Sequence, residues 1–465
     1  MIEKIFPVKL QLNILQLEGY EIRRFLIWVC NNFFKRSLEG KKKLVWTSKA
    51  RLLYRIVFLL NILVISLLYI TYGGYGFIIG FILSTQCYLY LSISVILMRP
   101  YEILNKYIVK TRTRKKIESL KKLKVIGVTG SYGKTSIKEF LYHILKSQYK
   151  ILKTPESYNT LFGISKVVDY ELDSNYDFFI CEMGAYKIGE IRELCEMLQP
   201  TYGVLSGINE QHIERFGSIE NTKKAKFELM EAIPANGFSI VNVDNEIVRN
   251  SYSGYGEKII PYGFSDDRFT IRNVVVESSE TKFDLILDFK EYKAKVLLIG
   301  NSHLSNILSS ATIAYLLGVN SKKIIEQIGT LKPVPHRLEV KEYEDLDATI
   351  IDDSYNSNPT GFKEALNTLG LFENRPKVLV TPGIVELGVR NDEIHKELGL
   401  KAGSICDYIF LIGKKNERTI AFEHGVLDKT KVNYIGHINS IWSEIGKLKL
   451  KKPVVLIEND LPDNY

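Results

Sequence analysis

The sequence of 465 residues has few cysteines, and they form no pattern that would build a disulfide framework or a zinc site. The five cysteines, at positions 30, 87, 181, 195 and 406, include no Cys-x-x-Cys pair. An odd number of unpaired cysteines is typical of reduced thiols in a cytosolic protein. With 46% apolar and 25% charged residues, the composition also excludes a collagen-like or wholly disordered chain. The length allows about three domains.

Acidic residues are scarce in the N-terminal part. Residues 1–124 contain 22 Lys/Arg and 6 Asp/Glu, a net charge of +16, whereas the remainder contains 40 and 47, a net charge of −7. A protein that binds nucleic acid would carry its positive charge on the folded body. We therefore expect no nucleic-acid partner, and the basic part needs a separate explanation.

Charged residues are absent from the 43 residues 56–98, a run that glycines interrupt near its middle. A bilayer core needs about 20 apolar residues per helix. The run therefore predicts two transmembrane spans, 52–72 and 75–98, joined by a tight turn at Gly73, Gly74 and Gly76. A helical hairpin buried in a soluble core is the alternative.

Both flanks of this run are basic, and positively charged flanks stay on the cytoplasmic side of a membrane. We therefore expect a multi-pass protein of the cytoplasmic membrane with both termini and the rest of the chain in the cytoplasm. The first span lies too far from residue 1 to be a cleavable signal peptide. Residues 10–29, with leucines, aromatics and paired charges, predict either an amphipathic helix on the inner leaflet or an ordinary packed helix.

A strand, a glycine-containing turn and a helix are predicted from residue 124 onward. KVIGVTG is rich in β-branched residues, SYGKTS follows, and apolar residues then recur at helical spacing from Ile137. In this context backbone N–H groups and a helix N-terminus converge on an anion. The turn therefore predicts a phosphate loop, in which Lys134 meets the β and γ phosphates of ATP and Thr135 ligates magnesium. This motif departs from the common G-x-x-x-x-G-K-[ST] pattern of phosphate loops, because Val128 stands in place of the first glycine.

Several further segments occur in the order found in Mur ligases. They are FFICEMGA, GINEQHIERFGS, KKAKFEL, GNSHLSNILSSATIAYLLG, VPHRLEV and IDDSYNSNPTG. Together with TGSYGKTS they resemble that family over residues 124–465. DDSYNSNP resembles the MurF branch, and TPGIVELG followed by His395 is similar to the same branch. Members of that branch join D-alanyl-D-alanine to a UDP-muramoyl tripeptide.

This resemblance implies an α/β fold: a P-loop central domain, 124–330, and a smaller Rossmann-like C-terminal domain, 331–465. A basic segment 1–51, a hairpin 52–98 and a basic linker 99–123 precede them in place of the usual UDP-sugar domain. The implied activity is an ATP-dependent ligase of cell-wall synthesis that forms a peptide bond through an acyl phosphate. The implied partners are the UDP-muramoyl peptide, D-alanyl-D-alanine and the inner leaflet; the oligomeric state stays open.

In addition to the resemblance, physical reasons support a role in the site for some of the matched residues. Glu182 ends the apolar run 178–181, where a carboxylate at the carboxyl edge of a parallel sheet can hold magnesium; a solvated loop residue is the alternative. Lys226 resembles a lysine that the family carries as a carbamate, although Lys223 and Lys224 beside it also fit a solvated face. Asn209 could orient a ligand or close a turn.

The resemblance implies a larger set of roles, in which Lys134, Thr135 and Glu182 have the physical support given above. It implies catalytic roles for Lys134, His212, Lys226 and Asn159, and two magnesium ions held by Thr135, Glu182, His212 and Lys226. For nucleotide binding it implies Gly130, Ser131, Gly133, Lys134, Thr135, Ser136, Asn306, Arg337 and Asp353, with Asn306 at the adenine; a helix cap is the alternative for Asn306. Tyr355, Asn356 and Asn358 follow a predicted strand, either as part of the site or as a polar turn.

Because Arg337 and Asp353 belong to a different domain from Lys134, we expect the site to assemble by domain closure. The missing UDP-sugar domain implies either that the remaining domains recognise the donor, which we favour, or that the donor is membrane-borne. Another acid–amino-acid ligase of cyanophycin or folate type and a noncatalytic membrane scaffold are the alternatives. The five residues Lys134, Thr135, Glu182, His212 and Lys226 argue against the scaffold, and two spans line no path for a transporter.

Overall fold

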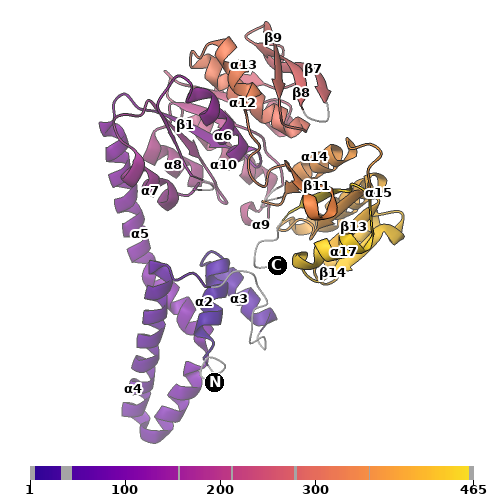
Figure 1. The fold of residues 1–465 in the computed structure, drawn as a ribbon. Coiled ribbons are helices and arrows are strands. Elements are labelled where there is room, and N and C mark those ends of the chain that lie inside the picture. The colour runs from indigo at the N-terminus through magenta and orange to yellow at the C-terminus, as the bar shows by residue number, and fades with distance from the viewer. Residues whose placement is uncertain are drawn as a thin grey trace. The chain divides into compact units, whose positions relative to one another are not determined.

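A computed structural model describes residues 6–32, 44–155, 158–210, 213–276, 280–355 and 357–459 (Figure 1). The chain forms two compact units that divide between Ile108 and Val109. The N-terminal unit is helical, and the C-terminal unit contains three β-sheets.

The N-terminal unit is built on a helical hairpin. Helix α4 (Ser48–Ser84) folds back on itself at Gly73, whose φ of 58° lies in the left-handed region. Beyond this turn the two arms touch closely, because a Cβ added to Gly76 would lie 1.8 Å from the carbonyl oxygen of Leu68. Helix α5 (Cys87–Ser119) follows. The glycine turn that the sequence predicts is thus present, and Gly76 serves the contact between the arms.

Two short helices pack against the hairpin. They are α2 (Val8–Leu17) and α3 (Ile22–Asn31), separated at Gly19 and Tyr20, which have φ values of 66° and 61°. The prediction of one helix over 10–29 is therefore wrong. Their buried side chains support the packed alternative and join α4 and α5 in one cluster: Leu12, Leu15, Phe25, Val29, Leu53, Val57, Leu91 and Val95.

Apolar side chains near the turn of the hairpin are exposed. Ile70, Tyr75 and Leu63 have 78%, 82% and 62% of their surface accessible. A hairpin buried in a soluble core would have these side chains covered, which is not what the structure shows. Helices α4 and α5 are long and apolar enough to cross a membrane.

The last third of α5 belongs to the C-terminal unit. Ion pairs join Lys110 to Glu196 on α8 (Glu190–Leu198) and Arg112 to Asp169 on α7 (Leu161–Glu171), and Lys116 donates a hydrogen bond of 2.9 Å to the Asp169 carbonyl. The basic segment expected to be a linker over 99–123 is therefore helical as far as Ser119.

A parallel six-stranded sheet forms the centre of this unit, in the order β2-β3-β1-β4-β5-β6. Ile126 and Val128 on β1 pack on the side of α6, α12 and α13, whereas Val125 packs on the side of α7, α8 and α10. The strands are β1 (Lys124–Thr129), β2 (Ile151–Lys153), β3 (Phe178–Glu182), β4 (Tyr202–Leu205), β5 (Phe238–Asn242) and β6 (Ile259–Tyr262). The helices are α6 (Lys134–Leu145), α7 (Leu161–Glu171), α8 (Glu190–Leu198), α9 (Ile213–Phe216), α10 (Ile219–Ala232), α11 (Glu246–Arg249), α12 (Asn301–Leu316) and α13 (Ser321–Gly329).

A three-stranded antiparallel sheet was not predicted. It consists of β7 (Phe269–Val276), β8 (Thr281–Leu287) and β9 (Lys290–Val296). Its buried side chains, Phe269, Phe283 and Leu285 among them, extend the core formed by α6 and α12. The alternation of apolar and polar residues in these segments is a strand signal.

The C-terminal domain has its own six-stranded sheet, in the order β10-β11-β15-β12-β13-β14, with β10 alone antiparallel to its neighbour. This confirms the predicted small α/β domain. The strands are β10 (Glu339–Tyr343), β11 (Ala348–Asp353), β12 (Lys377–Thr381), β13 (Tyr408–Ile412), β14 (Val432–Ile435) and β15 (Val454–Glu458); the helices are α14 (Pro359–Gly370), α15 (Asn391–Ile405), α16 (Glu417–Gly425) and α17 (Ile441–Lys447).

The hairpin contact predicts a difference between two neighbouring glycines. In Gly76→Ala the new methyl group meets the Leu68 carbonyl, so the arms must separate and the free energy of unfolding should fall by about 1–3 kcal/mol. Gly74→Ala is the matched control, because a Cβ there meets nothing within 4 Å. Unfolding of both variants in detergent measures the difference; equal stability would contradict this packing.

Candidate functional site

The phosphate loop lies between the end of β1 and the start of α6. Gly130 and Gly133 have φ values of 148° and 76°, and neither has room for a side chain. A Cβ at Gly130 would lie 1.9 Å from Ser206 Oγ, and one at Gly133 would lie 2.6 Å from Asn306 Oδ1. The predicted loop is thus formed by close approach of backbone to its neighbours.

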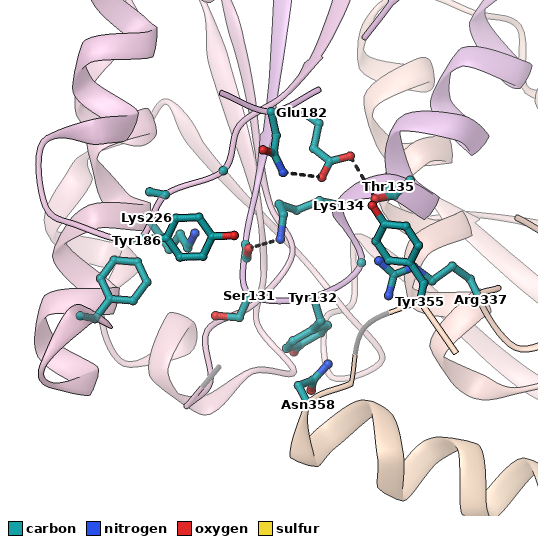
Figure 2. Close-up of a pocket in the computed structure, with 16 residues that line it drawn as sticks. Ser131, Tyr132, Lys134, Thr135, Glu182, Tyr186, Lys226, Arg337, Tyr355 and Asn358 are labelled. Carbon is teal, nitrogen blue, oxygen red and sulfur yellow. Dashed lines mark hydrogen bonds between the residues drawn. The ribbon is translucent and has the colours of Figure 1, made fainter. Parts of the chain in front are cut away.

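Lys134 folds back over this loop. Its Nζ donates a hydrogen bond of 2.8 Å to the carbonyl oxygen of Gly130 (Figure 2). Burial lowers the pKa of Lys134, the Glu182 carboxylate opposes this shift, and the Arg337 cation adds to it. The ammonium group therefore lies in a poorly solvated place, where an anion would be its preferred partner.

Glu182 is the carboxylate at the centre of the site. It ends β3, is 2% exposed, and accepts a hydrogen bond of 3.0 Å from Thr135 Oγ1 and one of 3.4 Å from Asn159 Nδ2. Figure 2 shows the Thr135 side chain directed at this carboxylate. Glu182 is therefore a buried residue of the site, and the solvated-loop alternative is wrong.

Lys138 was not among the predicted site residues. This side chain is fully buried on α6, and its Nζ lies 3.4 Å from Glu182 Oε2. Because it follows Ile137 and precedes Phe140 on the apolar face of the helix, it is a lysine at a core position. A lysine among the apolar residues of a predicted helix was the signal that could have identified it, since a lysine is rarely buried unless it is paired.

Lys226 lies on α10 and faces the same cavity. It is 3% exposed, with its Nζ 5.6 Å from the centre of the Phe216 ring, whereas Lys224 is exposed. Burial, with the nearby charge of Lys134, lowers the pKa of Lys226 to about 7. The solvated-face alternative therefore fits Lys224 and not Lys226.

These groups surround one cavity of about 350 Å³. In Figure 2, Tyr186 and Lys226 lie on one side of the phosphate loop, with Arg337 and Tyr355 on the other. The cavity is lined by Gly130, Ser131, Tyr132, Gly133, Lys134, Thr135, Asn159, Glu182, Gly184, Ala185, Tyr186, Phe216, Lys226, Arg337, Tyr355 and Asn358. Nine predicted site residues thus come together there.

Among the described residues, three of the predicted ones do not line this cavity. Ser136 is buried at the start of α6, and Asn306 lies against Gly133 beneath the loop. Asp353 accepts a hydrogen bond of 3.2 Å from the Leu338 backbone N–H. His212, predicted as a metal ligand, lies outside the described residues, as does Asn356.

The loop after β11 contributes to the site from the C-terminal domain. Arg337 stacks on the Tyr355 ring at 4.4 Å, and Asn358 Oδ1 accepts a hydrogen bond of 2.7 Å from Asn209 Nδ2. The loop is thus part of the cavity wall and not a simple polar turn. Asn209 joins the central domain to the C-terminal domain.

Two ion pairs strengthen this junction. Arg215 Nη2 lies 2.9 Å from Glu386 Oε1, and Arg390 pairs with Glu210. Arg215 also lies over the Tyr186 ring, at 4.5 Å. These pairs join the central domain to the C-terminal domain.

A buried carboxyl pair stands at the carboxyl ends of β11 and β15. Asp353 and Glu458 are register partners in these parallel strands, and Ser357 Oγ donates a hydrogen bond of 2.6 Å to Glu458 Oε1. Burial raises the pKa of Asp353 to about 6 and raises that of Glu458 as well. The buried pair therefore resists ionisation of both carboxyl groups at once.

His395 holds the loop after β12. Its Nε2 accepts a hydrogen bond of 3.0 Å from the Ile384 N–H, and its Nδ1 lies 2.8 Å from the Asn391 carbonyl oxygen. These partners require a neutral ring that donates from Nδ1, and burial lowers the pKa of His395 to about 4. The histidine of the TPGIVELG segment therefore has a structural role.

Among the described residues, no group of three or more His, Cys, Asp or Glu side chains is placed to hold a metal ion. Glu182 and the Thr135 hydroxyl, 3.0 Å apart, are nevertheless oxygen ligands of the kind that magnesium prefers. They fit an ion that completes its coordination with substrate phosphates and water.

Family sequence models match most of the C-terminal unit. The Mur ligase middle domain matches residues 128–314, and the Mur ligase, glutamate ligase domain matches residues 336–457. This chain is also similar to curated relatives called UDP-N-acetylmuramoyl-tripeptide--D-alanyl-D-alanine ligase. The one from Escherichia coli strain K12 is 30% identical over 299 residues, and the one from Bacillus subtilis strain 168 is 29% identical over 293. Each match covers 63% of this chain, and 65% and 63% of the relative.

The fold is also similar to solved structures. MurF from Acinetobacter baumannii has a TM-score of 0.68 and 24% identity, with 76% of this chain and 77% of that chain covered. MurF from Thermotoga maritima in complex with ADP has the same score and identity, with 77% and 80% covered. Both Mur ligase domains occur here in the same order, with the phosphate loop in the first. The chain therefore belongs to the Mur ligase family.

Proposed function

We propose that this protein is an ATP-dependent ligase that joins a carboxylate to an amine. The observation that carries the proposal is the single cavity in which Lys134, Thr135, Glu182, Asn159 and Lys226 meet. Phosphoryl transfer depends mainly on positioning and on neutralising charge. A phosphate loop beside one buried carboxylate and two buried lysines supplies both.

The proposed chemistry begins with activation of the acid, because an oxide is a poor leaving group. The donor carboxylate attacks the γ-phosphorus of ATP, and ADP leaves as an acyl phosphate forms. The acceptor amine then attacks the acyl carbon, phosphate leaves, and the amine loses a proton to give the amide.

Lys134 is placed to exchange its hydrogen bond with Gly130 for contacts with the phosphates, and Arg337 lies across the cavity as a second cation. Asn159, beside Glu182, is the proposed contact for the donor carboxylate.

Thr135 and Glu182 are the proposed ligands of magnesium, which would offset the negative charge of the transferring phosphoryl group. Ser131, Gly133 and Ser136 belong to the proposed phosphate loop. Asn306 is the proposed contact for adenine, and Asp353 is a proposed contact for the nucleotide. His212 is retained as a proposed ligand of a second ion.

Lys226 is the proposed site of a carbamate. Its depressed pKa leaves much of the amine neutral near pH 7, and a neutral amine attacks CO₂ to form an N–C bond and release a proton. The product is an anion that can face a metal ion, as the family resemblance implies.

The carbamate predicts a carbonyl resonance in ¹³C NMR spectra of protein supplied with ¹³C-bicarbonate. The resonance should be absent from Lys226→Gln and should weaken as the pH falls below about 7, because protonation of the amine blocks its formation. Lys224→Gln, at the exposed neighbour, is the control and should keep it. A wild-type spectrum without the resonance would rule the carbamate out.

The proposed substrates are those named for the curated relatives: a UDP-muramoyl tripeptide as the donor and D-alanyl-D-alanine as the acceptor. The N-terminal unit is a helical hairpin with two packed helices, which departs from the UDP-sugar domain expected of this branch. A Mur-like ligase that uses a membrane-borne or poly-amino-acid donor is therefore the second candidate.

Phosphate release by the protein in detergent tests the activity. With magnesium-ATP, release should require both the UDP-muramoyl tripeptide and D-alanyl-D-alanine, and Lys134→Ala should lower it by at least about 100-fold. If only a lipid-linked muramoyl peptide supports release, the second candidate is correct. Release that is unchanged in Lys134→Ala would contradict the proposed site.

We also infer that two spans, 52–72 in α4 and 75–98 across the end of α4 and the start of α5, anchor the protein in the cytoplasmic membrane, with the C-terminal unit in the cytoplasm. The support comes from their length, their exposed apolar side chains and their basic flanks.

Removal of residues 1–108 tests the anchor. The truncation keeps Lys110 and Arg112, whose ion pairs fasten the start of the remaining chain to α8 and α7. The shortened protein should be soluble without detergent and should keep its activity on a soluble donor within about threefold. The full chain, assayed in membranes and in detergent, is the control. Loss of donor binding with ATP binding intact would instead place part of the donor site in the N-terminal unit.

A further inference from the structure

Lys138 is a buried charge that the proposed mechanism does not use. It has no accessible surface and lies one helical turn after Lys134 on α6. It does not line the cavity, whereas Glu182 does. Lys138 therefore approaches the Glu182 carboxylate from the protein interior, on the side away from the cavity.

Two carboxylates compensate the Lys138 ammonium. Its Nζ lies 3.4 Å from Glu182 Oε2 and 3.8 Å from Glu139 Oε1, and Glu139 in turn pairs with Lys153. Taking an ammonium out of water is costly unless it is paired and hydrogen-bonded. A leucine or methionine would fill this core position without the cost of desolvating an ammonium group. We therefore look for a role of the positive charge of Lys138.

Lys134 and Lys226, which line the cavity together with Glu182, cannot provide a fixed positive charge beside this carboxylate. Lys134 bonds to Gly130 and, on the proposed function, leaves it for phosphate. Lys226 has a depressed pKa and, on the same proposal, becomes an anion. Lys138 alone of these three lysines sits outside the cavity and keeps its place beside Glu182.

We propose that Lys138 is a positioning residue that holds the Glu182 carboxylate toward Thr135 for metal binding. The contact with Lys138 involves Oε2, the same oxygen that accepts the bond from Thr135. The contact with Lys138 restrains the orientation of the Glu182 carboxylate from the side away from the cavity. The side that faces the cavity stays free for an ion. The inference rests on the proposed role of Glu182 as a magnesium ligand.

Mn²⁺ binding, measured by electron paramagnetic resonance with ADP on the full chain in detergent, tests this role. Lys138→Met should weaken Mn²⁺ affinity by about 10- to 100-fold, as loss of a group that orients a metal ligand does. Its ADP affinity in EDTA should stay within about threefold, and Lys138→Arg should recover most of the Mn²⁺ affinity. Lys166→Met, an exposed lysine on α7, is the control.

The outcomes separate this inference from the proposed function. A wild-type protein that binds no Mn²⁺ with ADP refutes the metal site itself. Wild-type affinity in a folded Lys138→Met refutes the positioning role alone. If Lys138→Met does not fold, the comparison moves to Lys138→Gln and Lys138→Arg: the glutamine must lose affinity while the arginine keeps it, and equal behaviour refutes the role.

Discussion

The catalytic unit depends on the burial of like charges around a single carboxylate. Lys134, Lys138 and Lys226 surround Glu182 in a region from which water is largely excluded. Glu182, Glu139 and the Gly130 carbonyl oxygen compensate the buried ammonium groups of Lys138 and Lys134, and without such partners their burial would be costly. On the proposed function, a polyphosphate would take over the compensation of Lys134 when this side chain leaves Gly130.

The glycines of the loop make this arrangement possible by letting neighbouring elements come close. Ser206 and Asn306 occupy the space where side chains at Gly130 and Gly133 would lie. The loop is thus held by β4 and α12 as well as by its own strand and helix. On the other side of the cavity, Asn209, Arg215 and Glu210 hold the C-terminal domain through Asn358, Glu386 and Arg390. The expected closure would then adjust an existing junction.

The sequence predicted the parts that depend on local pattern. The phosphate loop, the strand that ends at Glu182 and the glycine turn of the hairpin follow from spacing and residue type, and the structure confirms each. It also places Lys226 and not Lys224 in the core. What the sequence could not supply depends on contacts between distant segments, such as the pairing of Asp353 with Glu458 or of Lys138 with Glu182. The break between α2 and α3 was missed although Gly19 was a signal for it, because apolar residues continue on both sides; Tyr20 prolongs the left-handed turn, which its residue type does not signal.

The last third of α5 changes how the basic N-terminal region acts on its surroundings. Lys110 and Arg112 pair with Glu196 and Asp169 of the same protein, Lys116 donates a hydrogen bond to the Asp169 carbonyl oxygen, and Lys49 pairs with Glu102. Charges engaged in this way add little to the attraction of anionic lipid headgroups, which falls off within a Debye length. On the proposed membrane anchor, the apolar surface of the hairpin and not these four charges holds the protein in place, and high salt that strips peripheral proteins from vesicles should leave this one bound.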